Sequence, residues 1–525
     1  MADKKKVVII GGGPAGLTAA WELVKDDANS YDVTILEATK EFGGISRTVK
    51  YHGNRMDIGG HRFFSKDDRI MNWWKEILPL QGAPSYDDKR LGRHHDLEPG
   101  GPDPEQIDEV MLKRHRVSRI FWNQHFLDYP ITLSPNTLKA MGPKITMQAG
   151  FSYLASVFHK LPETNLENFY INRFGRKLYS MFFEDYTEKL WGRHPSEISA
   201  DWGAQRVKGL SIMNVLKNAV LKLMPQHKTD NSKVETSLIE EFWYPKLGPG
   251  QLWETVEKKA EDKGVTVLTD ARVTAVNQEG GKISSVTYID SAGQTHQLEA
   301  DQFISSMPLK DLVNALDKSE AGAPEDMKEI ANGLPYRDFV TVGLLVRKLR
   351  IRNNTDIPTL GHPPIVPDNW IYVQDPGYKV GRFQIFNNWS PYLVKDVDST
   401  VWIGMEYFCN EGDDFWNMTD EQAEDLAIKE LTRMRVINGK QDVLDAHRER
   451  VQKAYPAYFD TYQDIDHLDS FGNLYCVGRN GQHHYNNQDH SMATSIEAVN
   501  NIKTGRTSKK NVWEVNTEKS YHESK

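Results

Sequence analysis

Three glycines close to the start of the chain have the spacing of a dinucleotide-binding turn. Gly11, Gly13 and Gly16 match G-x-G-x-x-G and follow an apolar run at residues 7–10. The run predicts a buried parallel strand, and the residues after the turn predict a helix. A pyrophosphate can rest on the N-terminus of such a helix. Gly11 would allow the tight turn, Gly13 would let a phosphate approach the backbone, and Gly16 would let the helix pack on the strand.

A second strand and a second glycine pair narrow the choice of ligand. Residues 31–36 predict a strand that ends at Glu37, about 20 residues beyond the first glycines, where a ribose hydroxyl needs an acceptor. Gly43 and Gly44 follow, and then Arg47. This order resembles the FAD proteins of the amine oxidase and glutathione reductase type rather than a plain NAD dehydrogenase. The weaker alternative is a structural βαβ unit without a ligand.

A further glycine pair, Gly59 and Gly60, directly precedes His61. Two adjacent glycines let the backbone come close to a flat ring, so we expect His61 at the edge of the isoalloxazine. A lone histidine is more often structural, but its place beside these glycines favours a functional role.

The polar run from Arg479 to Ser491 stands at the start of a predicted helix. Amides at that helix N-terminus could stabilise negative charge on a reduced flavin. His483, His484 and His490 lie in this run, but no carboxylate or cysteine accompanies them at convincing metal-ligand spacing. No metal site is therefore expected.

Arg382, Tyr372 and Trp389 lie in a stretch that alternates like an antiparallel sheet. An arginine with aromatic neighbours on one sheet face suits a diphosphate and a sugar ring. An ordinary sheet face explains the same pattern equally well.

The order of these patterns predicts an α/β fold, with a discontinuous Rossmann-like FAD-binding domain, a helical insertion and an antiparallel β-sheet substrate domain. The ligand should lie in the cleft between domains. The expected divisions are residues 1–80, 246–318 and 466–503 for the FAD-binding domain, 81–245 for a surface insertion and helical domain, 319–465 for the substrate sheet, and 504–525 for a polar, frayed tail.

Local patterns predict several individual elements. An amphipathic helical series runs from residue 166 to Trp191, and two glycines at 280–281 predict a hairpin turn. A helix from about Thr419 has a capping box with Gln422. Alternating residues predict the strands of the antiparallel sheet at Phe339–Val346, Trp370–Val373, Arg382–Phe386 and Val401–Phe408.

Composition excludes some classes of protein. The chain has 525 residues, a formal net charge of −9 and two cysteines. The negative charge argues against nucleic acid as a partner, and two cysteines cannot form a disulfide framework. We expect neither a signal peptide nor a transmembrane segment, because the apolar run at residues 7–24 contains four glycines and a proline. A cytoplasmic protein is the resulting expectation.

Motifs along residues 7–502 resemble the UDP-galactopyranose mutase family, especially its eukaryotic-type branch. The matching segments are Gly59-Gly60-His61 with Phe64-Ser65, Arg116-x-Ser118 before Tyr129-Pro130, Lys189-Leu190-Trp191, Gln205-Arg206-Val207, Tyr244-Pro245, Trp370-Ile371-Tyr372, and an ending with Gly478-Arg479, Tyr485, Asn487-Gln488-Asp489-His490-Ser491 and Glu497-Ala498-Val499. The resemblance implies a ring contraction of a nucleotide-sugar substrate without net redox. In that family N5 of reduced FAD attacks the anomeric carbon, and NADPH or NADH reduces the flavin.

The resemblance also implies roles for individual residues. Arg206 and Arg382 would hold the diphosphate, and Trp389 stands where the family usually has a phosphate-binding tyrosine. Thr132 stands where the eukaryotic branch has a glutamine that reads uracil, so the base and the sugar stay open. The residues expected to bind substrate or act in catalysis are His61, Arg206, Arg382, Tyr372, Tyr455, Tyr485 and Trp389. The residues expected to bind FAD are Gly11, Gly13, Pro14, Ala15, Gly16, Glu37, Gly43, Gly44, Arg47, Gly60, His61, Val273, Arg479, Asn487, Gln488 and Ser491.

Two other classes of function compete with a mutase. An oxidase or desaturase of the protoporphyrinogen oxidase and amine oxidase superfamily would share the N-terminal motifs, but it would not need a diphosphate clamp of arginines and tyrosines. A non-catalytic FAD-bound scaffold would have little need of His61 beside a polar, flavin-facing ending. The sequence leaves the sugar, the base, the electron donor and the oligomeric state open.

Overall fold

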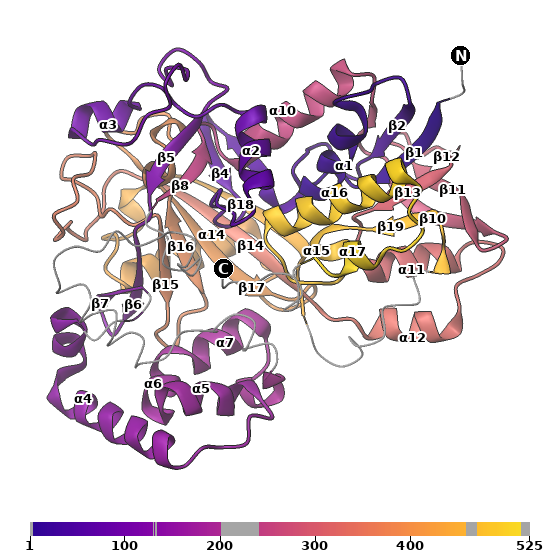
Figure 1. The fold of residues 1–525 in the computed structure, drawn as a ribbon. Helices are drawn as coiled ribbons and strands as arrows, with labels where there is room; N and C mark the ends of the chain where they lie inside the picture. Colours follow the sequence, from indigo (N-terminus) through magenta and orange to yellow (C-terminus); the bar gives the residue numbers. More distant parts are fainter. Residues whose placement is uncertain (1–3, 130, 132–133, 201–240, 458–469, 516–525) are drawn as a thin grey trace.

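A five-stranded parallel sheet forms one side of the molecule. The structure, a computed structural model, describes residues 4–129, 131, 134–200, 241–457 and 470–515. The sheet has the order β19-β13-β1-β2-β9. Its strands are β1 (Lys5–Ile10), β2 (Tyr31–Leu36), β9 (Thr266–Leu268), β13 (Gln302–Ser305) and β19 (Leu474–Cys476). Three separate stretches of the chain therefore build one sheet, which confirms the predicted discontinuous α/β fold (Figure 1).

Both faces of the parallel sheet are covered. Val7 and Ile9 pack into a core with helices α1 (Pro14–Val24), α10 (Pro249–Asp262) and α16 (Gln488–Thr504), and with α2 (Asp68–Ile77). Val8 and Ile10 point to the other side, into a core with α11 (Leu309–Asp317) and α12 (Glu325–Gly333). Burial on both faces explains why β1 reads as an unbroken apolar run rather than an alternating one.

An antiparallel three-stranded sheet lies beside this second core. It has the order β10-β11-β12, with bounds β10 (Arg272–Glu279), β11 (Lys282–Ile289) and β12 (Thr295–Glu299). The hairpin predicted at residues 280–281 is confirmed, since β10 and β11 pair antiparallel across that turn.

A seven-stranded sheet forms the centre of the molecule, in the order β18-β14-β17-β16-β15-β6-β7. Its strands are β6 (Ser118–Trp122), β7 (His125–Asp128), β14 (Tyr336–Val346), β15 (Trp370–Val373), β16 (Arg382–Ile385), β17 (Val401–Cys409) and β18 (Val443–Pro456). The sequence predicted β14 to β17, but it did not predict that β6 and β7 would extend their sheet. Helix α14 (Asp420–Arg433) begins at the predicted capping box of Thr419 and Gln422, and the short helix α13 (Phe386–Trp389) follows β16.

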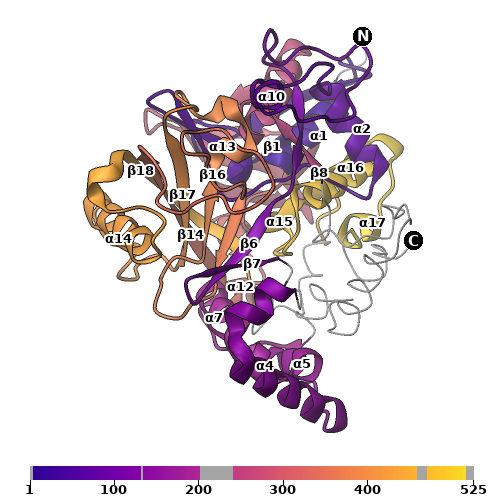
Figure 2. The same cartoon turned by 90° about the vertical axis from the view of Figure 1, so that its left-hand side faces the viewer.

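Helices α4 to α7 form a lobe that projects from the edge of this sheet (Figures 1 and 2). Their bounds are α4 (Pro135–Phe158), α5 (Leu166–Phe174), α6 (Arg176–Phe182) and α7 (Glu184–Trp191). The amphipathic series predicted from residue 166 to Trp191 is divided into three helices. Gly175 causes the first break, because its φ of 79° lies outside the helical range.

Two short antiparallel strand pairs and three short helices complete the described strands and α-helices. They are β3 (Thr48–Tyr51) paired with β4 (Asn54–Asp57), β5 (Met111–His115) paired with β8 (Glu241–Pro245), and the helices α3 (Tyr86–Leu91), α15 (Gly478–Gly481) and α17 (Lys510–Trp513). Helix α17 lies in the stretch expected to be a frayed tail, yet Val512 is buried and its carbonyl accepts a hydrogen bond from Gln482 at 3.0 Å. None of the described helices is long and apolar enough to span a membrane. The limits drawn between domains stay predictions.

Candidate functional site

One cavity of about 1350 Å³ connects the glycine turn after β1 with the face of the seven-stranded sheet. Its wall includes the N-termini of α1 and α16 and residues of β15, β16 and α7. A pocket for a single small ligand is usually about 300–1,000 Å³. This cavity is larger, so it has room for a dinucleotide and a second ligand.

The glycine turn has the packing that the sequence predicted. Gly11 has a φ of 104°, and a Cβ on it would lie 2.2 Å from Ser306 Oγ. A Cβ on Gly16 would lie 1.9 Å from the carbonyl oxygen of Gly11, so only glycine lets α1 pack this closely on the turn. Gly13 is the N-cap of α1 and lines the cavity opposite Gly44. The free amides of the first turn of α1 are therefore available to a pyrophosphate.

Glu37 is fixed at the end of β2 by backbone donors. The amide of Gly12 donates to its Oε2 at 2.7 Å, and the amide of Thr39 donates to its Oε1 at 2.8 Å. The side chain lines the cavity. A carboxylate held in this way is a ready acceptor for ribose hydroxyl groups.

The start of α16 lies beside the start of α1 on the cavity wall, since Ala15 and Ser491 both lie against Gly478. Asn487 is its N-cap, and Ser491 Oγ donates to Asn486 Oδ1 at 2.8 Å. Both polar atoms of the Gln488 side-chain amide are buried and have no hydrogen-bond partner among the described residues. Because buried polar groups are nearly always paired, an unpaired amide on a cavity wall indicates a ligand contact.

These features fit FAD. All of the predicted FAD-binding residues except Gly16 and Gly43 line the cavity. Gly43 does not line the cavity but contacts a residue of the glycine turn, since its amide donates to the carbonyl of Gly12 at 2.9 Å. The α1 turn and Glu37 would hold the pyrophosphate and ribose, and Gln488 and Asn487 would face the ring system. When bound, the flavin supplies a ring that can accept electrons and that is nucleophilic once reduced.

His61 lines the cavity as a neutral imidazole. Its Nε2 lies 2.9 Å from the carbonyl oxygen of Ile45 and 3.0 Å from that of Ile58. Because both partners are acceptors, Nε2 carries the proton and Nδ1 is the acceptor of the ring. Burial lowers the pKa of His61 to about 4, and the nearby Arg479 and Arg382 add to this effect. The ring therefore stays uncharged at neutral pH.

Arg382 is held from two sides on the sheet face. Its Nε donates to Glu406 Oε2 at 2.6 Å, and its Nη2 donates to the Tyr455 hydroxyl at 3.0 Å. Gln384 donates to the other oxygen of Glu406 at 2.6 Å. The guanidinium also lies 4.5 Å from the ring centroid of Trp370. These contacts fix the plane of Arg382 at the cavity wall.

Two stacked tyrosine pairs flank Arg382. The rings of Tyr455 and Tyr485 lie 6.0 Å apart with planes 10° from parallel. The rings of Tyr372 and Tyr129 lie 4.5 Å apart with planes at 18°. All four side chains line the cavity. The structure thus brings His61, Arg382 and the three predicted tyrosines to one cavity.

A family model described as "Flavin containing amine oxidoreductase" matches residues 14–486. The chain belongs to this family. A horse (Equus caballus) protein named "Amine oxidase [flavin-containing] A" is 40% identical over 72 residues, which are 14% of this chain and 13% of the horse protein. A Klebsiella pneumoniae protein named "Probable UDP-galactopyranose mutase" is 23% identical over 204 residues, 38% of this chain and 44% of that protein. The chain thus aligns with less than half the length of these relatives.

Several solved structures share the fold of this chain. A reduced UDP-galactopyranose mutase matches with a TM-score of 0.73 at 20% identity, covering 98% of this chain and 99% of the other. A putrescine oxidase bound to putrescine matches with a TM-score of 0.56 at 14% identity, covering 96% and 99%. Identities this low establish the fold, and membership of a flavin-containing family supports FAD as the cofactor.

Trp389 is not placed as the sequence suggested. Its side chain is fully buried and is absent from the cavity wall, and its indole N–H donates to the carbonyl of Asn369 at 2.9 Å. The donor that would contact a phosphate is therefore used inside the protein, and the expected contact is corrected to a packing role behind Trp370, 6.3 Å away between ring centroids. Arg206 and Thr132 lie outside the described residues.

Two arginines that line the cavity were not predicted from the sequence to act together. Arg62 and Arg116 have no carboxylate partner among the described residues, and the Nε of each is buried without a hydrogen bond. Within the described part of the chain, the Arg62 side chain makes one hydrogen bond, which its Nη2 donates to Ser118 Oγ at 2.9 Å. Aromatic rings surround it instead: the centroids of Phe242, Trp370 and Trp389 lie 5.5–5.7 Å from its Cζ.

Neighbouring arginines show how unusual this pair is. Arg114 makes a bidentate pair with Asp87 at 2.7 and 3.1 Å, and Arg119 donates to Asp368 at 2.8 Å. Arg116 lies between them in sequence, and the contact that the described part of the chain gives its guanidinium is the ring of Tyr129, 5.4 Å away. Burial lowers the pKa of Arg62 to about 10, with a further effect from the charge of Arg116. Arg62 remains cationic at neutral pH, so the cavity holds uncompensated positive charge beside His61.

Proposed function

We propose that the chain is an FAD-dependent nucleotide-sugar mutase that interconverts pyranose and furanose forms without net redox. The observation that carries this proposal is the pair of arginines, Arg62 and Arg116, that face the cavity without a carboxylate partner among the described residues. A guanidinium whose Nε is buried without a partner is costly, because that donor has lost its water without gaining a hydrogen bond. A substrate with a diphosphate would supply the missing negative charge.

The positive charge also separates the proposal from an amine oxidase. The putrescine oxidase named above binds putrescine, a diamine that is cationic at neutral pH. Unpaired guanidinium groups beside His61 would repel such a substrate, whereas a nucleoside diphosphate would be attracted. Planar guanidinium groups also match phosphate geometry in a bidentate manner.

The side chains on the sheet face would act on the leaving group. As the bond from the anomeric carbon to the diphosphate breaks, negative charge on the phosphate oxygens increases. Arg382, held by Glu406, would stabilise that charge without having to reorganise. The hydroxyls of Tyr455, Tyr485 and Tyr372 would add hydrogen bonds, and neutral His61 would accept a hydrogen bond at Nδ1 near the flavin edge. NADPH or NADH is the proposed reductant of the flavin.

The test uses the purified flavoprotein. It would be reduced with dithionite under anaerobic conditions and incubated with UDP-, dTDP- and GDP-hexoses. We expect pyranose–furanose exchange with at least one of them, detected by chromatography of the nucleotide sugars, and no exchange by oxidised enzyme. The second candidate is an oxidoreductase of the same family, which is favoured by the putrescine oxidase fold match. Oxygen consumption with amines, and no exchange with any nucleotide sugar, would establish that alternative.

A further inference from the structure

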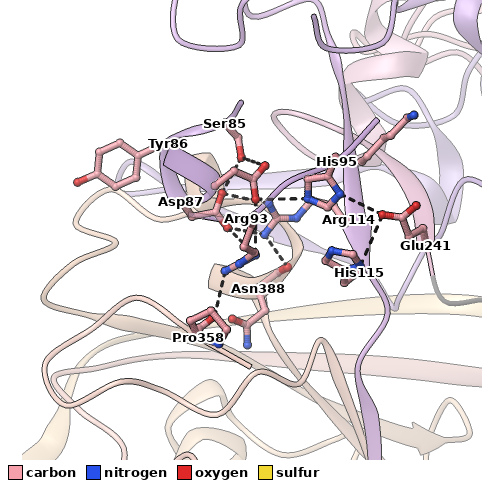
Figure 3. A network of polar contacts seen from close by, with 12 residues as sticks. Ser85, Tyr86, Asp87, Arg93, His95, Arg114, His115, Glu241, Pro358 and Asn388 are labelled. Carbon is pink, nitrogen blue, oxygen red and sulfur yellow. Dashed lines mark hydrogen bonds and ion pairs between the residues drawn. The ribbon is translucent and has the colours of Figure 1, made fainter. Parts of the chain in front are cut away.

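Two histidines and a glutamate converge at the outer end of the β5–β8 ribbon (Figure 3). His115 ends β5, and Glu241 begins β8 as its direct cross-strand partner. His95 reaches them from the loop after α3. The Nδ1 of His95 lies 3.0 Å from Glu241 Oε1, and the Nδ1 of His115 lies 3.6 Å from the same oxygen.

These separations are close to the distances between neighbouring ligand atoms around a bound metal ion. Zinc binds histidine nitrogen and carboxylate oxygen at about 2.0–2.2 Å in a tetrahedron, which places neighbouring ligand atoms about 3.4 Å apart. One ligand atom from each of the three residues lies within 4.8 Å of the others. The side chains of His115 and Glu241 are 45% and 47% exposed. They are therefore free to move by up to about one ångström, which would bring their ligand atoms to the spacing of a coordination shell. The exposed side also admits a water as fourth ligand.

His95 has the surroundings of an oriented metal ligand. Its side chain is only 2% exposed, and its other ring nitrogen, Nε2, lies 3.4 Å from Asp88 Oδ1, within ion-pair distance although neither atom makes a hydrogen bond among the described residues. Asp88 is itself fixed, because Ser85 Oγ donates to its Oδ2 at 2.7 Å. A carboxylate behind the second nitrogen of a ligating histidine sets the tautomer and aims the ring, as in many zinc sites. This is an observation independent of the three converging atoms.

The charges around the cluster favour a cation. Asp87, Asp88 and Glu241 surround it, and the nearby cation Arg114 is already paired with Asp87. Arg93 also pairs with Asp87, at 3.3 Å. With both histidines neutral, the carboxylates outnumber these two guanidinium groups. A proton on His95 is the competing occupant: burial lowers its pKa, but the contacts with Asp88 and Glu241 outweigh burial and raise the pKa to about 9.

We propose that His95, His115 and Glu241 form a divalent-metal site, of which zinc is the best match, with Asp88 as the positioning residue of His95. No pattern in the sequence indicates this site, since the ligands are 20 and 126 residues apart along the chain. The site would tie the insertion that follows α2 to the β5–β8 ribbon. Its effect would reach the cavity, because the residues directly after His115 and Glu241 are Arg116 and Phe242, which both line the cavity.

The test measures zinc binding by the complete flavoprotein. After treatment with a chelator and its removal, the protein would be titrated with Zn²⁺ in a calorimeter at pH 7.5, and with Co²⁺ by absorption. We expect one ion per chain and the absorption bands of tetrahedral cobalt. His115→Ala and Glu241→Gln should each weaken binding at least tenfold. Asp88→Asn should weaken it by about 10–100-fold, the range for losing a carboxylate that orients a ligating histidine. His94→Ala is the matched control, because His94 is the exposed neighbour of His95.

The outcomes distinguish a metal site from a protonated histidine cluster. His115→Ala changes an exposed side chain, so its flavin content and melting temperature without metal should equal those of the parent. Failure of the parent to bind zinc would leave the proton as the occupant and overturn the proposal. Equal binding by the parent, His115→Ala and Glu241→Gln would place the metal elsewhere and overturn it as well. Equal weakening by His94→Ala would do the same.

Discussion

Arg382 and Glu406 form a buried ion pair, with Arg382 Nε donating to Glu406 Oε2 at 2.6 Å. Burial raises the pKa of the Glu406 carboxyl, and the charge of Arg382 opposes that change. The pair makes Arg382 a rigid donor, but it also means that part of its charge is already balanced. Arg62 and Arg116 therefore contribute positive charge that Arg382 alone does not.

Replacing Arg382 with Ala should reduce both stability and activity. Loss of Arg382 leaves Glu406 buried without its cation, which costs about 3–5 kcal/mol, and kcat/KM for a nucleotide sugar should fall by roughly 10²–10³-fold. Urea unfolding and a mutase assay measure the two effects. Glu406→Gln added to Arg382→Ala should recover most of the stability but not the activity. Arg382→Lys should restore only part of the activity, because lysine lacks the planar fork. Full activity in Arg382→Ala would remove this residue from the diphosphate clamp.

Replacing Glu37 with Ala should weaken FAD binding while leaving the fold intact. The carboxylate accepts hydrogen bonds from Gly12 and Thr39 and would accept them from the ribose. Loss of charged hydrogen bonds worth about 1.5–3 kcal/mol corresponds to an affinity loss of roughly 10–150-fold. Titration of the apoprotein with FAD, followed by flavin fluorescence, measures it. Asp32→Asn is the control, because Asp32 is exposed on the same strand. Unchanged affinity in Glu37→Ala would contradict the assigned cradle.

Replacing Arg62 or Arg116 with Met should weaken UDP binding to the holoenzyme. Each change removes an unpaired cation but keeps much of the length of the side chain, so we expect a loss of roughly 10–150-fold for UDP. Uridine, which has no phosphate, should bind equally to parent and variants. Arg90→Gln serves as the control for loss of one positive charge, since Arg90 is on the surface and pairs with Asp398. Equal losses for UDP and uridine would indicate a collapsed pocket rather than a missing phosphate contact.

The buried carboxyl of Asp57 should make stability depend on pH. Burial raises its pKa to about 7 from 3.8, against hydrogen bonds from Tyr244 and Thr48. Between these values the folded protein holds a proton that the unfolded chain releases, so the contribution of Asp57 to stability falls as pH rises from about 4 to about 7. The full effect is at most about 4 kcal/mol. The stability of Asp57→Asn relative to the parent should therefore increase between pH 4 and pH 8 in urea unfolding. A constant difference across that range would show that Asp57 is already ionised when folded.

The glycine turn and its strand could be predicted because every signal in it is local. Gly11 needs its positive φ and Gly16 needs its missing side chain within a span of six residues. The capping box of α14 is equally local, since the side chains of Thr419 and Gln422 accept hydrogen bonds from each other's backbone amides. Such features depend on neighbours along the chain, so a pattern in the sequence is sufficient.

Features that depend on distant partners could not be predicted. Strand β6 joins the central sheet by pairing with β15, so Ser118 lies beside Trp370. No sequence pattern near Ser118 indicates that it pairs with Trp370. The predicted role of Trp389 was wrong for the same reason. Its indole N–H donates to the carbonyl of Asn369, and this bond forms only when the segments of β15 and α13 come together. Whether an arginine has a carboxylate partner depends on the tertiary fold, so the sequence could not show that Arg62 and Arg116 have none among the described residues.

The parallel sheet is completed by a strand from the far end of the chain, and this governs when the protein can acquire its cofactor during synthesis. β1 and β2 leave the ribosome first, whereas β19 and the first turn of α16, with Gln488 and Ser491, are among the last ordered parts to emerge. Domains that fold as units during translation can begin to work before the chain is finished. The proposed flavin site includes Gln488 and Ser491, so it would be complete only when nearly the whole polypeptide has been made, and a chain that terminates early would lack part of it.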